Sequence, residues 1–291
     1  MLSILIPTYD YTCYKLVYDL HEQAEQLDIP YEIIVAEDGS KSPVTIIANH
    51  KITDLSNCIH HIRKKNIGLA ATRNELAEMA RYEWILILDS DAKVDNANFL
   101  ANYVDCMGKA EVICGGLHHQ AVNYDPNRTL RFKYETLADK HRSAKERNQI
   151  SYSQLSCFNI LMHKPTFMQI LFDKDCKEYG YEDALFGVEL EKRGISILHV
   201  DNPLLHSGLD TNESFVKKTE TALRTLKGLN GKMNGRSKLE NTYQKMKSLH
   251  LLWFLKAVYF MFKRPMKANL LSKNPNLLVF NLYKLGYYSN L

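Results

Sequence analysis

The sequence predicts an α/β protein: a mostly parallel sheet flanked by helices, followed by a helical C-terminal region. Over the first 115 residues, short apolar β-rich runs alternate with helical patterns, which is typical of a parallel sheet covered on both faces. A change in charge near residue 210 marks the start of the C-terminal region. The 291 residues are 45% apolar and 24% charged, a balance that excludes a disordered or low-complexity protein.

Four short runs predict strands, the third of them more weakly than the others, and helical patterns lie between them. Pro7 ends the first run, and Pro30 ends the helix that follows it. The fourth run leads straight into Asp89. In such a sheet the ligand lies beyond the carboxyl ends of the strands, so the side chains that follow these runs are site candidates. The predicted strands are 2–6, 31–36, 58–62 and 84–88, and the predicted helices are 16–27 and 68–81.

The second part of the chain is less regular. Residues 118–150 are polar and aperiodic, and they predict a long loop or short helices. A helix is expected over 181–193 and a strand over 195–200. A long helix over 237–262 is then expected to close at Arg264-Pro265.

Charge divides the chain at about residue 210. Residues 1–210 hold 22 Lys and Arg against 30 Asp and Glu, whereas residues 211–291 hold 15 against 3. This asymmetry predicts a domain boundary there and an anionic partner for the basic region. It also disfavours a nucleic-acid binder, which would be basic throughout.

The cysteines and the hydropathy bear on the compartment. None of the six cysteines has CxxC spacing, so a zinc or thioredoxin-type motif is not expected, and scattered thiols fit a reduced cytosol. No apolar run reaches the ~18 to 20 residues that span a bilayer. No basic leader precedes the first strand. A cytoplasmic protein is therefore expected, with peripheral attachment to the inner face of the membrane as an extension of that hypothesis.

The main chemical signal is Asp89-Ser90-Asp91. Two carboxylates spaced i, i+2 lie on the same side of an extended backbone, and they repel each other unless a cation lies between them. Hard oxygen ligands suit Mg²⁺ or Mn²⁺, with phosphate oxygens completing the shell. The alternative is a polar strand end in which Asp91 caps a helix.

Other polar residues follow the predicted strands. Thr8 and Asp38 should converge with Asp89 on one crevice. Asp38 could accept a hydrogen bond from an N–H group of a nucleobase, and Tyr9 could stack on that base. Gly68 lies at the start of the next helix and permits close approach to the backbone, and Arg73 in the same helix could contact an anion. Each has a plainer interpretation as a turn or a surface residue.

Two further candidates lie later in the chain. Glu182-Asp183 begins a predicted helix, where one carboxylate could take a proton from a hydroxyl, although capping alone explains acidic residues there. His206 could complete a metal shell that carboxylates begin, although a lone histidine in a loop is more often a surface residue.

Taken together, these residues resemble a family-2 glycosyltransferase of the GT-A fold. The resemblance covers about residues 1–210, and it rests on the order and spacing of weak pieces. It departs from the family at Glu37, where Asp is usual, and at Thr72, where Ala is common. It also lacks the Gln-x-x-Arg-Trp signature of processive members. The pieces are Ile4-Leu5-Ile6-Pro7-Thr8-Tyr9, Glu37-Asp38-Gly39-Ser40, Asn66-Ile67-Gly68 through Arg73-Asn74, Asp89-Ser90-Asp91, Tyr179-Gly180-Tyr181-Glu182-Asp183 and His206.

The resemblance implies a Rossmann-like catalytic domain over 1–210, with a nucleotide-sugar half at about 1–115 and an acceptor half at about 116–210. It implies inverting transfer of a sugar from a nucleoside-diphosphate sugar to a hydroxyl of a saccharide or lipid-linked acceptor, as in surface polysaccharide synthesis. Asp183 would be the catalytic base, and Glu182 would lie on the acceptor side. Mn²⁺ or Mg²⁺ would be held by Asp91 and His206. The donor would be held by Pro7, Thr8, Tyr9, Asp38, Asn66, Gly68, Arg73 and Asp89, and UDP is the expected nucleotide because one Asp and one aromatic ring serve uracil.

Rival hypotheses remain at this point. A nucleotidyltransferase would want a Gly-rich loop after the first strand, where Pro7-Thr8-Tyr9 stands. A non-catalytic nucleotide-sugar or carbohydrate-binding module would tolerate loss of the base and the metal ligands, yet all of them are present. The basic C-terminal region 211–291 is predicted to be helical. Its apolar stretch 251–262 suits either an anionic membrane surface or packing on the domain or in a homodimer.

Overall fold

The computed structural model describes residues 1–119, 125–139, 142–173, 176 and 179–291. The described chain forms two compact units. The first unit contains 1–119, 142–173, 176 and 182–208, and the second contains 125–139, 179–181 and 209–291. Each unit is described by itself.

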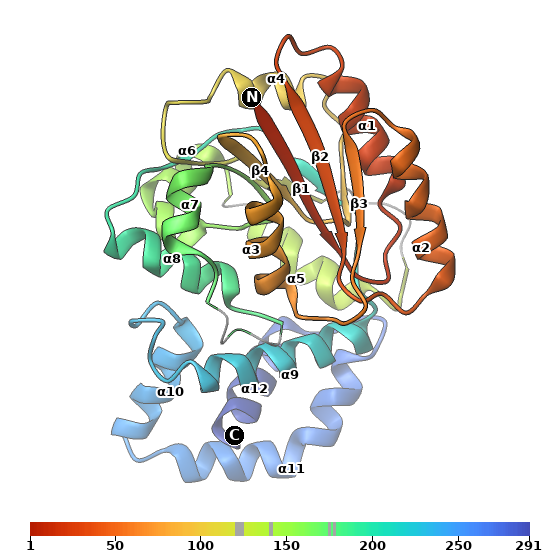
Figure 1. The fold of residues 1–291 in the computed structure, drawn as a ribbon. Helices are drawn as coiled ribbons and strands as arrows, with labels where there is room; N and C mark the ends of the chain where they lie inside the picture. Colours follow the sequence, from red (N-terminus) through yellow and green to blue (C-terminus); the bar gives the residue numbers. More distant parts are fainter. Residues whose placement is uncertain (120–124, 140–141, 174–175, 177–178) are drawn as a thin grey trace. The chain divides into compact units, whose positions relative to one another are not determined.

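The first unit contains a seven-stranded sheet within the described residues, in the order β3-β2-β1-β4-β8-β6-β9. Strands β3, β2, β1 and β4 run parallel to one another, as the alternating pattern predicts, whereas β8 runs antiparallel to both β4 and β6. Figure 1 shows β1, β2 and β3 side by side. The strands are β1 (Leu2–Thr8), β2 (Tyr31–Glu37), β3 (Cys58–Ile62), β4 (Trp84–Leu88), β6 (Val112–Cys114), β8 (Asn159–His163) and β9 (Ile197–His199).

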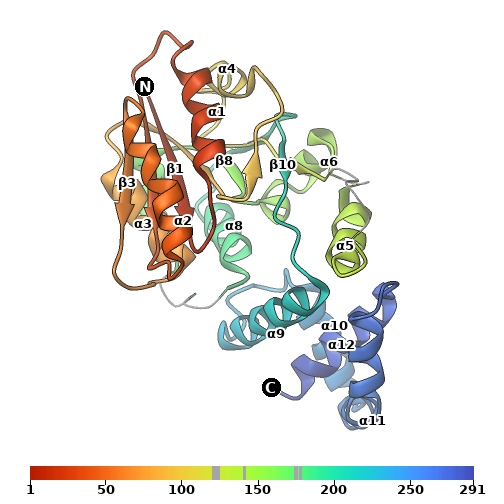
Figure 2. The ribbon, with the colours of Figure 1, turned by 90° about the vertical axis from the view of Figure 1, so that its right-hand side faces the viewer.

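Helices cover both faces of this sheet, and the central strands β1 and β2 are therefore buried on both sides. Leu2, Ile4 and Ile6 pack with apolar residues of α1 and α4, which lie beside each other (Figure 2). On the other side α3 contacts β1 and packs against α7, which in turn contacts α8. These helices are α1 (Tyr14–Ala24), α3 (Leu69–Met79), α4 (Phe99–Val104), α7 (Lys164–Ile170) and α8 (Glu182–Lys192).

Two local predictions for the first unit need revision. Strand β1 does not end at Pro7 but continues to Thr8, in register with Glu37. Pro7 is tolerated because the pairing of β1 with β4 stops at Leu5. The N–H that Pro7 lacks is therefore not needed for a hydrogen bond to β4. Helix α2 (Pro43–His50) was not predicted, although Ser42 caps it and Pro43 opens it.

The polar segment 118–150 forms short helices where it is described. These are α5 (Thr129–Asp139), in the second unit, and α6 (Ala144–Gln149), in the first. A small sheet in the first unit, of order β5-β10-β7, joins β5 (Ala92–Lys93), β10 (Leu204–His206) and β7 (Leu117–His118).

The second unit is helical, as predicted, but the expected long helix over 237–262 is wrong. This segment forms two helices, α10 (Lys238–Ser248) and α11 (Leu252–Leu270). His250 between them has a φ of 58°, which is incompatible with a continuous right-handed helix. Helix α11 also passes through Pro265 instead of stopping there. Helices α9 (Asn212–Gly228) and α12 (Leu277–Ser289) complete the unit, whose core includes Val216, Tyr259 and Phe280. No described helix is long and apolar enough to cross a bilayer.

Candidate active site at the carboxyl ends of the strands

Three predicted site residues lie at one edge of the sheet. Thr8 ends β1, Asp38 follows β2 and Asp89 follows β4, and these strands are parallel neighbours. The backbone N–H of Asp38 donates to the carbonyl of Thr8 at 2.9 Å, which extends the ladder by one bond. The tertiary structure therefore brings these three residues to the same edge.

The Asp38 carboxylate organises the loop before α3. Its two oxygens accept from the backbone N–H groups of Ile67 (2.8 Å) and Gly68 (2.9 Å), and the Asn66 amide donates to the Asp38 carbonyl at 2.9 Å. Gly39 is required here, since its φ is 68° and a Cβ would lie 2.4 Å from the backbone nitrogen of Asn66. Two segments of the resemblance thus pack directly on each other. Asp38 is buried, and each of its oxygens keeps one lone pair for a ligand.

Glu37, where the resemblance would lead us to expect Asp, has a structural explanation. Its buried carboxylate accepts from the Asn49 amide at 2.6 Å and from the Ser40 hydroxyl, and His60 lies close to it. Burial raises the pKa of Glu37, but these neighbours more than offset that effect, so the pKa lies below its usual range. The longer side chain thus reaches a partner on α2.

Arg73 joins two of the predicted functional carboxylates. Its guanidinium, only 1% exposed, donates from Nη2 to Asp89 at 2.7 Å and from Nη1 to Asp183 at 2.9 Å, and it lies over the Phe172 ring. The second oxygen of Asp183 accepts from the backbone N–H of Cys157 at 2.8 Å. Residues that are 16 and 110 positions from Arg73 in the chain are thereby held in one cluster.

The electrostatics of this cluster follow from burial and charge. Burial raises the pKa of Asp89, and the positive charge of Arg73 lowers it. The nearby carboxylates of Asp91 and Asp183 raise it further, so the pKa of Asp89 is about 6. Burial tends to lower the pKa of Arg73, yet the two carboxylates hold it above its usual value. The arginine is therefore a permanent cation between two acids.

Asp91 and His206 meet through the small sheet. Antiparallel pairing of β5 with β10 sets His206 opposite Ala92, and His206 Nε2 lies 3.1 Å from Asp91 Oδ2. His119, which was not predicted, lies 3.1 Å from the other ring nitrogen of His206. A Cβ at Gly208 would lie 2.1 Å from the same oxygen of Asp91, so only glycine leaves room there. A carboxylate and an imidazole that converge in this way fit a divalent ion, Mn²⁺ better than Mg²⁺.

The remaining predicted residues lie in the same unit. Tyr9 is 45% exposed, so its ring is open to a ligand, whereas the exposed Asn66 uses its amide to bond Asp38 and Gly68 within the loop. Pro7 is buried in β1, and Glu182 is half-buried in the first turn of α8. Their roles remain predictions.

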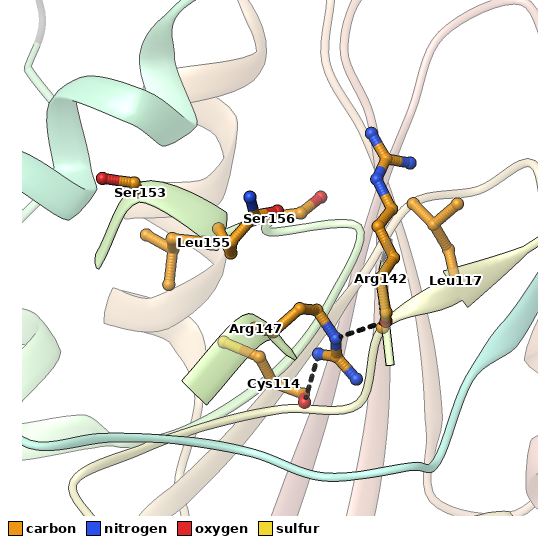
Figure 3. A pocket seen from close by; sticks show the side chains of 9 residues that line it. Cys114, Leu117, Arg142, Arg147, Ser153, Leu155 and Ser156 are labelled. Atoms are coloured by element: carbon orange, nitrogen blue, oxygen red, sulfur yellow. Dashed lines mark hydrogen bonds between the residues drawn. The ribbon is translucent and has the colours of Figure 1, made fainter. Parts of the chain in front are cut away.

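A pocket of about 180 Å³ also lies in the first unit, lined by Cys114, Arg142, Arg147 and Ser153–Ser156 among others (Figure 3). The Arg147 guanidinium is directed at backbone oxygens, including those of Cys114 (3.1 Å) and Arg142, whereas the Arg142 guanidinium points away from it. Ser156 is next in the chain to Cys157, which donates to Asp183. Sequence reasoning missed this pocket because only the polar character of 118–150 signalled it.

Comparisons with known proteins place the chain among glycosyltransferases. A chondroitin synthase of Pasteurella multocida (strain Pm70) is 24% identical over 242 residues, 70% of this chain and 24% of that protein. A chondroitin synthase of Escherichia coli is 36% identical over 109 residues, 36% of this chain and 15% of that protein. This chain thus spans at most about a quarter of the length of the curated relatives that it matches.

Two solved structures share the fold. The mannosyltransferase PcManGT of Pyrobaculum calidifontis, in complex with GDP-Man and Mn²⁺, has a TM-score of 0.53 and 15% identity over 79% of this chain and 64% of that chain. TarS 1-349 of S. aureus, in complex with UDP-GlcNAc, has a TM-score of 0.51 and 18% identity over 98% of this chain and 90% of that chain. At these identities the likeness shows the fold alone. The family model described as glycosyl transferase family 2 matches residues 3–175, more than half of the chain, and this protein belongs to that family of glycosyltransferases.

Proposed function

We propose that this protein is an inverting, metal-dependent glycosyltransferase that moves a sugar from a UDP-sugar to a hydroxyl of a saccharide or lipid-linked acceptor. The observation that carries the proposal is the Arg73 bridge. It ties Asp183, the proposed base, to Asp89 at the end of β4, where the donor is proposed to bind. Similar proteins support this class, since they include two chondroitin synthases and a protein whose structure holds UDP-GlcNAc.

The proposed mechanism uses the chain's own residues. Asp38 accepts a hydrogen bond from the nucleobase with the lone pairs that Ile67 and Gly68 leave free, and Tyr9 stacks on the base. Asp183 takes the proton of the acceptor hydroxyl as that oxygen attacks C1 of the sugar. The same displacement breaks the bond between C1 and the diphosphate oxygen, releases UDP and inverts the anomeric centre. The Ser153–Ser156 pocket supplies hydroxyl and amide groups for the acceptor. Glu182, next to Asp183 in the chain, is proposed to contact the acceptor as well. In this proposal, residues 1–210 form the catalytic domain and 211–291 the basic appendage.

Asp91 and His206 would hold the divalent ion, which neutralises charge on the leaving diphosphate when it is bound. We therefore expect Asp91→Asn to weaken Mn²⁺-dependent binding of UDP at least 10-fold, because the amide oxygen is a weaker ligand than a carboxylate. Isothermal titration of UDP with and without Mn²⁺ measures this effect. Asp105→Asn, an exposed residue that follows α4, is the matched control. Metal-dependent affinity that survives Asp91→Asn unchanged would remove Asp91 from the metal site. Titrations with GDP and dTDP test the choice of UDP.

We also propose that α11 binds an anionic membrane surface. Leu255 and Tyr259 pack inward, but several large apolar side chains stay exposed, with Phe260 at 89%, Trp253 at 71% and Met261 at 70%. The helix has four basic residues and no acidic one. Two copies that met face to face on α11 would set like charges against each other, whereas anionic lipid head groups complement them.

Sedimentation with vesicles tests this surface. We expect the full chain to pellet with vesicles that contain phosphatidylglycerol, and less with purely zwitterionic vesicles or at high salt. Trp253→Ser/Phe260→Ser should abolish binding. Val44→Ser/Ile47→Ser, which alters equally exposed apolar residues of α2, should not. A chain that stays in the supernatant with both vesicle types contradicts the membrane proposal. Light scattering then tests the homodimer instead.

A further inference from the structure

The second unit contains a cavity that sugar transfer does not explain. Its volume is about 760 Å³, inside the range of about 300–1,000 Å³ that is typical of small-molecule sites. Residues of α10 and α12 line most of it, and Tyr134 of α5 and Tyr181 contribute aromatic rings. Every lining residue belongs to the second unit, so the cavity is complete within it.

One wall of the cavity is an apolar stripe on α12. Leu278, Leu282 and Leu285 follow one another at spacings of four and three residues, which sets them on one face of the helix. Leu278 is 73% exposed and Leu282 is 55% exposed, while Leu239 of α10 lines the same cavity. Exposed leucines beside a hollow lose contact with water when an aliphatic chain lies along them.

The other feature of the wall is an unmatched cation. The Lys284 ammonium lies 4.6 Å from the Phe280 ring centroid and 5.0 Å from that of Tyr134. Among the described residues no carboxylate pairs with it, and burial alone lowers its pKa to about 8. At neutral pH the amine therefore stays mostly protonated. Ring contacts compensate its desolvation only in part, so the site costs stability unless an anion joins it.

We propose that this cavity binds an anionic amphiphile, a single phosphate or carboxylate head group carried on an aliphatic chain. The head group pairs with Lys284, and Lys238 adds a second positive charge at the cavity. The chain lies along Leu278, Leu282 and Leu285. The rings of Phe280 and Tyr134 cover part of the ammonium and shield that side of the pair from water, which strengthens its electrostatic attraction. This binding requires no donor sugar, so it stands or falls independently of the transferase proposal.

Isothermal titration of the full chain tests the proposal. The probes are dodecyl phosphate and laurate, each below its critical micelle concentration. Inorganic phosphate is the control for the head group alone, and dodecyl maltoside is the control for a neutral amphiphile. We expect both anionic amphiphiles to bind, and neither control to do so. Comparison of the two distinguishes a phosphate-bearing lipid from a fatty acid as the source of the head group.

Matched variants locate the binding. Lys284→Met should weaken binding at least 10-fold, the effect of removing one charge-assisted contact. It should also raise the Tm, because it replaces a half-buried amine that no described carboxylate pairs with by an apolar side chain. Leu239→Trp should fill the cavity and block both probes. Lys247→Met, an exposed lysine of α10, should change nothing. Trp253→Ser/Phe260→Ser should also bind as the wild type does, which excludes adsorption to α11.

Two patterns of binding would overturn the proposal. One is equal binding of dodecyl phosphate by the wild type and by Lys284→Met. The other is binding of dodecyl maltoside as strong as that of dodecyl phosphate, which would show an apolar hollow without anion recognition. Absence of any binding by the folded wild-type chain counts against it as well.

Discussion

Asp183→Asn is expected to lower kcat by about 10²- to 10⁴-fold, the usual contribution of a general base, with little change in the affinity for UDP. An asparagine cannot accept the proton of the acceptor hydroxyl. It still presents one oxygen, which can accept from the backbone N–H of Cys157, so the local backbone should hold. Steady-state kinetics with an acceptor, and titration of UDP without one, separate the two effects.

The control for this variant is Glu189→Gln. Glu189 lies on the same helix, α8, and pairs with Lys192 at the surface, where such a pair contributes little. It should keep the wild-type kcat. If Asp183→Asn turned over at the wild-type rate, another residue would be the base and the proposed mechanism would fail.

Arg73→Met should lower both stability and activity. It leaves the carboxylates of Asp89 and Asp183 without their buried cation, and breaking such a pair costs about 3 kcal/mol. Both side chains keep some exposure to water, at 30% and 28%, so we expect the lower end of the usual range. The free energy of unfolding, from urea titration, measures the loss.

The effect on activity distinguishes a positioning role from a merely structural one. Arg73→Lys keeps the charge but cannot reach two carboxylates with one planar fork, so it should recover more stability than turnover. Arg193→Met, an exposed residue just past α8, is the control and should match the wild type in both measurements. Full activity in a folded Arg73→Met protein would contradict the bridge as the device that holds Asp183.

Much of the first unit could be predicted, because its local signals agree with its global fold. The run from Trp84 to Leu88 predicted β4, and parallel topology then required Thr8, Asp38 and Asp89 to lie at one edge. Local position made Asp183 and His206 only weak candidates, and the resemblance alone gave them specific roles. Periodicity failed at 237–262, where an apolar, helix-like sequence hides the turn at His250.

The sequence by itself determined the fold class, the family and the chemical types of the site residues, because strand and helix periods and short motifs are local properties of the chain. Only the tertiary structure decided how those residues are used. Arg73 is an ordinary surface arginine by its local pattern, yet it is buried between two acids, and Asp38 holds a loop 30 residues away. Lys284 lines a cavity, and no carboxylate of the described residues pairs with it. Burial and the partner across the fold set the charge and the contacts of each group, and neither is encoded in the few residues around it.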